Sequence, residues 1–228
     1  MPHFDSTKHG FLVLLLCMVA LLVIVPFFQD WPQIRIIFSL FFTGVLLLLI
    51  VPFLNKTRLS LNIAVILAVP ALLMKWGVIL APELWEFFPG IENLFSILFF
   101  GYVLVVLFIG ILRARKIDTN LIIGSVCIYL LIGLEWAFVY SLLEQLAPGS
   151  FQGNLAEFSD ASQRQDWLLL HFVYYSYTTL TTLGYGDIVP RTSPAQMMSS
   201  LEAITGQFYL AILVARLIGI HLIGVLKP

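Results

Sequence analysis

The sequence predicts an all-α membrane protein built from six transmembrane helices and one re-entrant segment. Of its 228 residues, 60% are hydrophobic and 11% are charged, and the mean hydropathy is +0.99. Soluble domains contain roughly 45–50% apolar and about 25% charged residues. A single globule of this size could not bury such an apolar excess beneath a polar surface. The composition therefore excludes a cytosolic enzyme, a secreted module and a disordered chain.

Six apolar stretches are long enough to cross a membrane, because a helix of about 20 residues spans a hydrocarbon core of about 30 Å. They cover residues 11–28, 34–54, 59–80, 94–112, 121–146 and 195–222. The first is longer than the apolar part of a signal peptide and no small-residue cleavage site follows it, so we interpret it as a helix. Residues 147–194 are less apolar, but their aromatic stretch at 167–177 predicts a helix that enters the membrane without crossing it.

Basic residues gather in alternate loops, which predicts that both termini are cytoplasmic. The inner loops then carry Lys8, Lys56, Arg58, Arg113, Arg115, Lys116 and Lys227. The outer loops carry Asp30, Glu83, Glu86, Glu92, Glu144, Glu157, Asp160, Asp166 and Asp187 against Arg35, Lys75, Arg164 and Arg191. The net charge of −1 gives no basic field for nucleic acid. Because Cys17 and Cys127 both lie in apolar runs, neither a disulfide nor a metal site is expected.

The segment between the last two spans carries the chemistry. Residues 167–181 are compatible with a helix, which Gly184 and Gly186 must end. Glycines at alternate positions permit left-handed φ values, so successive carbonyl groups can point toward one axis. Four such strands would stack rings of carbonyl oxygens, with the Thr182 hydroxyl below them, and could replace the water shell of a cation. Irregular backbone at membrane depth is tolerated where it lines such a water-filled path.

Residues 182–187 read Thr-Leu-Gly-Tyr-Gly-Asp and resemble the selectivity filter of the potassium channel family, usually written Thr-Val-Gly-Tyr-Gly-Asp. The resemblance covers about residues 121–222 and is closest to prokaryotic six-transmembrane channels. It implies a homotetramer with the pore on its four-fold axis, a selectivity-filter loop, passive K⁺ conduction, a plasma-membrane location and no cofactor besides the permeant ion. The implied K⁺ ligands are the carbonyls of Thr182, Leu183, Gly184, Tyr185 and Gly186, and the Thr182 hydroxyl.

The resemblance also implies residues that support the filter, namely Asp187, Tyr175, Thr178 and Glu202. Asp187 ends the filter strand, and Tyr175 is expected to pack against Tyr185. Glu202 lies in the last span and has three open interpretations: a ring facing the pore cavity, a hydrogen bond behind the filter to Thr178 or Tyr177, or an ordinary helix–helix contact. Glu135 in the fifth span is interpreted as a packing partner for a hydroxyl on another helix.

The sequence divides the chain into a four-helix region at 1–118 and a pore domain at 119–228. A voltage sensor needs regularly spaced arginines within the membrane, and residues 94–112 contain no Lys or Arg. We therefore expect no voltage gating through the fourth span. The expected hinge and gate residues of the last span are Gly206, Phe208, Ile212 and Arg216. With six residues after Leu222, no appended cytoplasmic domain is expected.

Two other functions remain open at this point. A non-selective cation channel would share the architecture but normally lack the Tyr185-Gly186 step. A secondary cation transporter would use the glycine-rich segment as a broken helix, although the two halves of the chain show no inverted repeat. No enzyme motif is present in the sequence, so no enzymatic activity is expected. The expected partners are membrane lipids and three further copies of the chain. Neither a regulatory subunit nor nucleic acid is expected as a partner.

Overall fold

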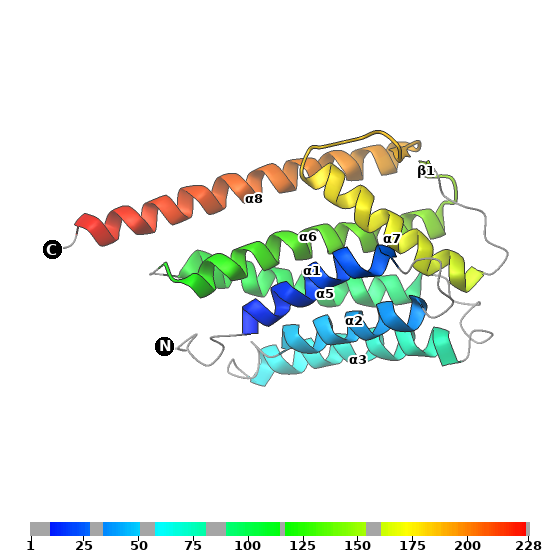
Figure 1. Ribbon diagram of the computed structural model, residues 1–228, viewed down its shortest axis with the longest axis horizontal. Helices are drawn as coiled ribbons and strands as arrows, with labels where there is room; N and C mark the ends of the chain where they lie inside the picture. Colours follow the sequence, from blue (N-terminus) through cyan, green and yellow to red (C-terminus); the bar gives the residue numbers. More distant parts are fainter. Residues whose placement is uncertain are drawn as a thin grey trace.

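The computed structural model describes residues 10–27, 34–50, 58–80, 90–114, 117–153 and 161–226. Within them the regular elements are helices and one pair of two-residue strands (Figure 1). The elements are α1 (Gly10–Phe27), α2 (Ile34–Ile50), α3 (Arg58–Leu80), α5 (Ile91–Arg113), α6 (Thr119–Leu146), β1 (Phe151–Gln152), α7 (Ala161–Leu180), β2 (Val189–Pro190) and α8 (Ser193–Leu226).

Each of the six predicted spans forms a helix, and the aromatic stretch forms the shorter helix α7. The second helix ends at Ile50, and the predicted continuation to residue 54 lies outside the described residues. Four helices are long and apolar enough to cross a membrane, over Arg58–Gly77, Ile91–Arg113, Thr119–Leu146 and Ser193–Gly219. The described apolar parts of α1 and α2, Gly10–Ile24 and Ser39–Ile50, are shorter. The protein is therefore a helical membrane protein with several spanning helices.

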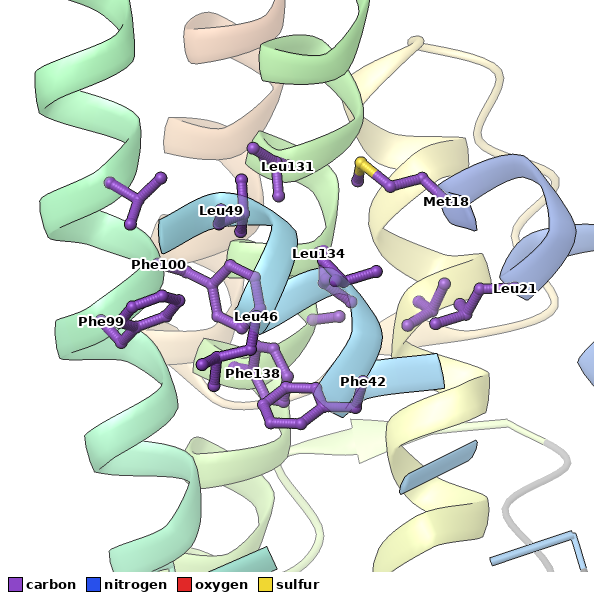
Figure 2. Close-up of a cluster of buried hydrophobic side chains, with 14 of the residues drawn as sticks. Met18, Leu21, Phe42, Leu46, Leu49, Phe99, Phe100, Leu131, Leu134 and Phe138 are labelled. Carbon is purple, nitrogen blue, oxygen red and sulfur yellow. The ribbon is translucent and has the colours of Figure 1, made fainter. Parts of the chain in front are cut away.

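Helix α6 lies at the centre of the fold and packs against α1, α5, α7 and α8. A cluster of buried rings fixes it to α2 and α5 (Figure 2). The rings of Phe100 and Phe138 stack with centroids 5.5 Å apart, and Phe42 meets Phe138 edge-on at 5.8 Å. Such aromatic pairs stabilise a core by about 0.5–1.5 kcal/mol beyond their buried area. The N-terminal helices are thus attached to α6.

Several charges that were expected in outer loops lie inside helices instead, and three of them are buried. Lys75 is in α3, Glu92 is in the first turn of α5, and Glu144 is in α6, and all three are buried. The Lys75 Nζ and Glu92 Oε1 atoms form an ion pair 3.1 Å apart. A charge can be held away from water when an opposite charge and hydrogen bonds compensate it. The expectation was wrong because pairing between distant helices is not visible in the charge pattern of one loop.

Helix α8 runs along one side of the molecule, and its C-terminal end projects beyond the other helices (Figure 1). One apolar face of this helix is exposed along much of its length; it includes Leu201, Ile204, Phe208 and Ile212. The start of α1 and the end of α8 lie at the same end of the bundle, whereas β1 lies at the opposite end (Figure 1). The predicted filter therefore lies far from the end of α8.

Candidate functional site

The backbone of residues 182–187, the predicted filter segment, is anchored to the last turn of α7. The N–H groups of Leu183 and Gly184 both donate to the carbonyl oxygen of Thr178, at 2.8 and 3.0 Å. The N–H of Thr182 donates to the carbonyl oxygen of Thr179 at 2.9 Å. These bonds use carbonyl groups that the end of a helix leaves without intrahelical partners. Thr178 thus supports the segment through its main chain.

Left-handed φ values occur at every second residue of the segment. The φ angles are 60° at Thr182, 52° at Gly184 and 78° at Gly186. The two glycines adopt the conformation expected of them, and Thr182 joins the alternation although it is not glycine. A threonine with positive φ is uncommon, and such strained residues cluster at functional sites. The alternation permits successive carbonyl oxygens to face one side of the strand.

The far end of the segment is tied to the middle of α7. The Tyr174 hydroxyl donates to Asp187 Oδ2 at 2.7 Å. This hydrogen bond to the carboxylate raises the pKa of Tyr174 to about 12, so the phenol stays protonated and remains a donor near neutral pH. Asp187 therefore has a defined partner, which the sequence motif alone did not identify.

Glu202 joins three helices behind the segment. Its Oε2 atom accepts a hydrogen bond from the Tyr140 hydroxyl of α6 at 2.5 Å, and its Oε1 atom accepts one from the Ser176 hydroxyl of α7. The carboxylate is fully buried. In the single chain it is closed off from solvent and bonded to α6 and α7 rather than facing a cavity, and the predicted partners Thr178 and Tyr177 are wrong. Ser176 and Tyr140 take their place because they lie on the α7 and α6 faces that meet α8.

Tyr175 is held within its own chain. Its hydroxyl forms a 2.7 Å hydrogen bond with Ser199 of α8, and its ring packs edge-on against Tyr140 and Phe151 with centroids 5.1 and 5.4 Å apart. The hydroxyl is therefore bonded to Ser199 rather than to Tyr185, whose side chain is 68% exposed in the single chain. The sequence indicated a supporting role for Tyr175 but gave no signal for Ser199.

Helix α8 lies very close to the end of α7 at Gly206. A Cβ atom at this position would collide with the carbonyl oxygen of Leu180 and come within 2.9 Å of its Cδ1 atom. Helix α8 continues unbroken through Gly206. The absence of a side chain at Gly206 therefore permits the close contact between α8 and α7.

The remaining predicted gate residues lie further along α8. Phe208 and Ile212 are 64% and 45% exposed, so each is available to face a pore or a neighbouring copy. Arg216 donates from Nη2 to the carbonyl oxygen of Ala114, the residue that caps the end of α5, at 2.8 Å. A cation is favourable at that position because unpaired carbonyl groups make a helix C-terminus partly negative.

Glu135 does not have the hydroxyl partner that was expected. Its Oε2 atom is buried without a hydrogen-bond partner, and its Oε1 atom faces Gly101 of α5, where a Cβ atom would lie 3.2 Å away. The carboxylate fits beside α5 because residue 101 has no side chain. Within the described residues, no group of three or more His, Cys, Asp and Glu side chains could hold a metal ion.

Comparison with known proteins agrees with this geometry. Residues 126–220 match a family described as ion channel, and the match spans most of α6, all of α7 and most of α8. The chain is 27% identical over 67 residues to "Potassium channel protein kcv" of Paramecium bursaria Chlorella virus 1. The matched region covers 29% of this chain and 68% of that protein. No solved structure matches the chain. These findings agree with the resemblance to the potassium channel family, and the match to the ion channel family covers residues 126–220.

Proposed function

We propose that the protein is a potassium-selective channel that conducts K⁺ passively along the backbone of residues 182–186. The observation that carries the proposal is the alternation of left-handed φ at Thr182, Gly184 and Gly186 within a segment anchored to Thr178. A strand of this kind presents carbonyl oxygens in succession, and carbonyl oxygens can replace the hydration shell of K⁺. The Thr182 hydroxyl and the carbonyls of residues 182–186 are the proposed ligands.

The proposed assembly is a homotetramer, because one chain supplies one filter strand and a closed ring needs four. Several features of the single chain support this. Leu183 and Tyr185 are 55% and 68% exposed, although both are large side chains beside the proposed filter. The exposed apolar face of α8 is also suited to contact a neighbouring copy. In the tetramer, Asp187, Tyr175, Thr178 and Glu202 support the filter.

We propose six membrane crossings with both termini in the cytoplasm of a plasma membrane. Residues 1–118 form a four-helix region, and residues 119–228 form the pore domain with α7 as a re-entrant helix. The start of α1 and the end of α8 at one end of the bundle support an even number of crossings (Figure 1). In this orientation the Asp187 end of the filter faces outward.

Gating is proposed to occur in α8 and not through a voltage sensor. Gly206 is the proposed hinge, and Phe208 and Ile212 form a proposed apolar constriction that closes by excluding water. Arg216 adjoins the constriction and attaches α8 to the end of α5. Helix α5 contains no basic residue before Arg113, which supports gating by another stimulus.

Purified protein in planar bilayers tests the proposal. With K⁺ on one side and Na⁺ on the other, the reversal potential should follow the K⁺ gradient, and Rb⁺ should pass. A reversal potential near zero in mixed K⁺ and Na⁺ would instead indicate a non-selective cation channel. Flux without resolved unitary currents would indicate a transporter. The variant Gly186→Ala is the internal control, because alanine at φ 78° is strained and should abolish K⁺ selectivity.

A further inference from the structure

The turn that follows α6 is held by a buried carboxylate. Glu144 accepts hydrogen bonds from the backbone N–H of Gly149 on Oε1 at 2.7 Å and from that of Phe151 on Oε2 at 3.1 Å. Gly149 adopts a φ of 85°, which turns the chain back toward the bundle. Since both carboxylate oxygens are used, Glu144 sets the position of Phe151 relative to the end of α6.

Phe151 begins the strand that holds the chain just after the filter segment. Strands β1 and β2 pair antiparallel, with Phe151 opposite Pro190 and Gln152 opposite Val189. The Arg191 N–H donates to the Ser150 carbonyl oxygen at 2.8 Å. Strand β2 starts two residues after Asp187. The position of the Asp187 end of the filter segment therefore depends on the turn that Glu144 holds.

The same end of α6 is attached to the N-terminal helices. One turn before Glu144, the Ser141 hydroxyl accepts a hydrogen bond from Asn93 Nδ2 of α5 at 2.9 Å, and both side chains are buried. Glu92, the neighbour of Asn93, forms the buried ion pair with Lys75 of α3. Separating this pair would leave two uncompensated charges away from water, so α3 and α5 resist moving apart at this end.

We propose that these contacts form a linkage through which the N-terminal helices set the conformation of the Asp187 end of the filter segment. The linkage runs from Lys75 and Glu92, through Asn93 and Ser141, to Glu144 and then to β1 and β2. Glu144 is its positioning residue: it touches no permeant ion and acts through the backbone of the turn. The inference rests on the proposed channel function and assigns a role to residues outside the pore.

The first test uses Glu144→Gln, which keeps the size of the side chain but replaces one acceptor oxygen by an NH₂ group that opposes a backbone N–H. We expect sustained K⁺ currents to decay about three- to tenfold faster, because one hydrogen bond of the turn is lost, with the decay slowed by raised K⁺ on the Asp187 side. The matched control is Leu146→Gln, which places the same amide on an exposed position in the same turn of α6 and should leave the decay unchanged.

The second test asks whether the contacts act as one linkage. Asn93→Ala should accelerate the decay as well. In the double variant with Glu144→Gln, the fold-change in decay rate should be smaller than the product of the two single fold-changes, since coupled residues are non-additive. Lys75→Met should also accelerate the current decay, and the charge swap K75E/E92K should restore much of the wild-type decay rate. A role in folding alone would change the yield of assembled protein without changing current decay or selectivity.

Several outcomes would overturn the proposal. Unchanged current decay in assembled Glu144→Gln and Asn93→Ala proteins would refute it, as would multiplicative effects in the double variant. If Glu144→Gln does not assemble, the Asn93→Ala and charge-swap results decide the question. The two proposals fail separately: wild-type protein that does not select K⁺ refutes the channel function, whereas selective wild-type protein with unaffected variants refutes only the linkage.

Discussion

The hydroxyl of Tyr140 lies 2.5 Å from Oε2 of Glu202 and thereby connects the helix that precedes the filter segment to the helix that follows it. The second oxygen of the carboxylate is bonded to Ser176 of α7, so one buried side chain of α8 contacts both α6 and α7. A buried carboxylate is costly unless its oxygens are hydrogen-bonded, and both oxygens of Glu202 are. The relative positions of α6, α7 and α8 around the filter segment therefore depend on Glu202.

Replacing Glu202 by Gln should weaken the packing of α8 against α6 and α7. The amide can accept from only one of the two hydroxyl donors, and an unsatisfied buried polar group costs about 1–3 kcal/mol. We expect a lower melting temperature of the assembled protein and reduced K⁺ over Na⁺ selectivity. Thermal unfolding in detergent and reversal potentials measure the two effects.

The control for this prediction is Tyr140→Phe, which removes one donor and leaves the carboxylate bonded to Ser176. It should produce a smaller change in both measurements. Wild-type stability together with wild-type selectivity in Glu202→Gln would show that the carboxylate does not brace the filter.

Gly206→Ala should disrupt the contact between α8 and the end of α7. The added methyl group would overlap the Leu180 carbonyl oxygen, and overpacking of this kind typically costs about 1–3 kcal/mol. Because that carbonyl lies two residues before the filter segment, we expect loss of K⁺ flux as well as lower stability. Flux into liposomes and retention of the oligomer on gels report the two effects.

Gly219→Ala is the matched control, since a Cβ atom there meets no other atom within 4 Å. It introduces the same methyl group into the same helix and should leave flux and stability unchanged. If both alanine variants behave alike, close packing at Gly206 is not what the site requires.

Much of the fold could be predicted from the sequence, because hydrophobic length and helix-breaking glycines are local signals. The six apolar stretches and the aromatic stretch each gave a helix, and Gly184 and Gly186 have the predicted left-handed φ. The positive φ of Thr182 could not be predicted, because a threonine adopts it only when the surrounding structure imposes it.

The side-chain partners could not be predicted, because they join residues that are far apart in the chain. Lys75 and Glu92 look like loop charges until α3 and α5 are packed together. Glu202 was identified as unusual from its depth in an apolar helix, but its partners depend on which faces of α6 and α7 meet α8. Glu144 resembles an ordinary charge at a helix end unless the following turn is known.

Tyr174→Phe should destabilise the Asp187 end of the filter. The variant loses the 2.7 Å hydrogen bond to the carboxylate, so we expect faster decay of sustained K⁺ current and an altered response to external K⁺. Recording both proteins under identical gradients measures the effect. Equal decay in the two proteins would exclude a role for this hydrogen bond.

The pH dependence of the Tyr174 contribution follows from the direction of its pKa shift. The pKa rises to about 12 in the folded protein, above the ordinary value of 10.0, because of the hydrogen bond to Asp187. The stabilisation is then fully present below about pH 10 and is lost as the pH rises through about 12. Between pH 7 and 9 the ratio of wild-type to Tyr174→Phe decay rates should stay constant; a steady fall over that range would contradict the assignment.

The conductance of the channel should depend only weakly on voltage. Each elementary charge that crosses the whole field contributes about 2.3 kcal/mol per 100 mV, so steep gating requires several charges within the membrane. Helix α5 has no basic residue between Ile91 and Leu112, and Arg113 lies in its last turn. Open probability in symmetric K⁺ without blockers should therefore change little between −100 and +100 mV, voltages at which such charges would act strongly. Neutralising the end charge with Arg113→Gln should leave this shallow dependence as it is. A steep curve in the wild-type protein, flattened by that substitution, would show that the end of α5 senses the field after all.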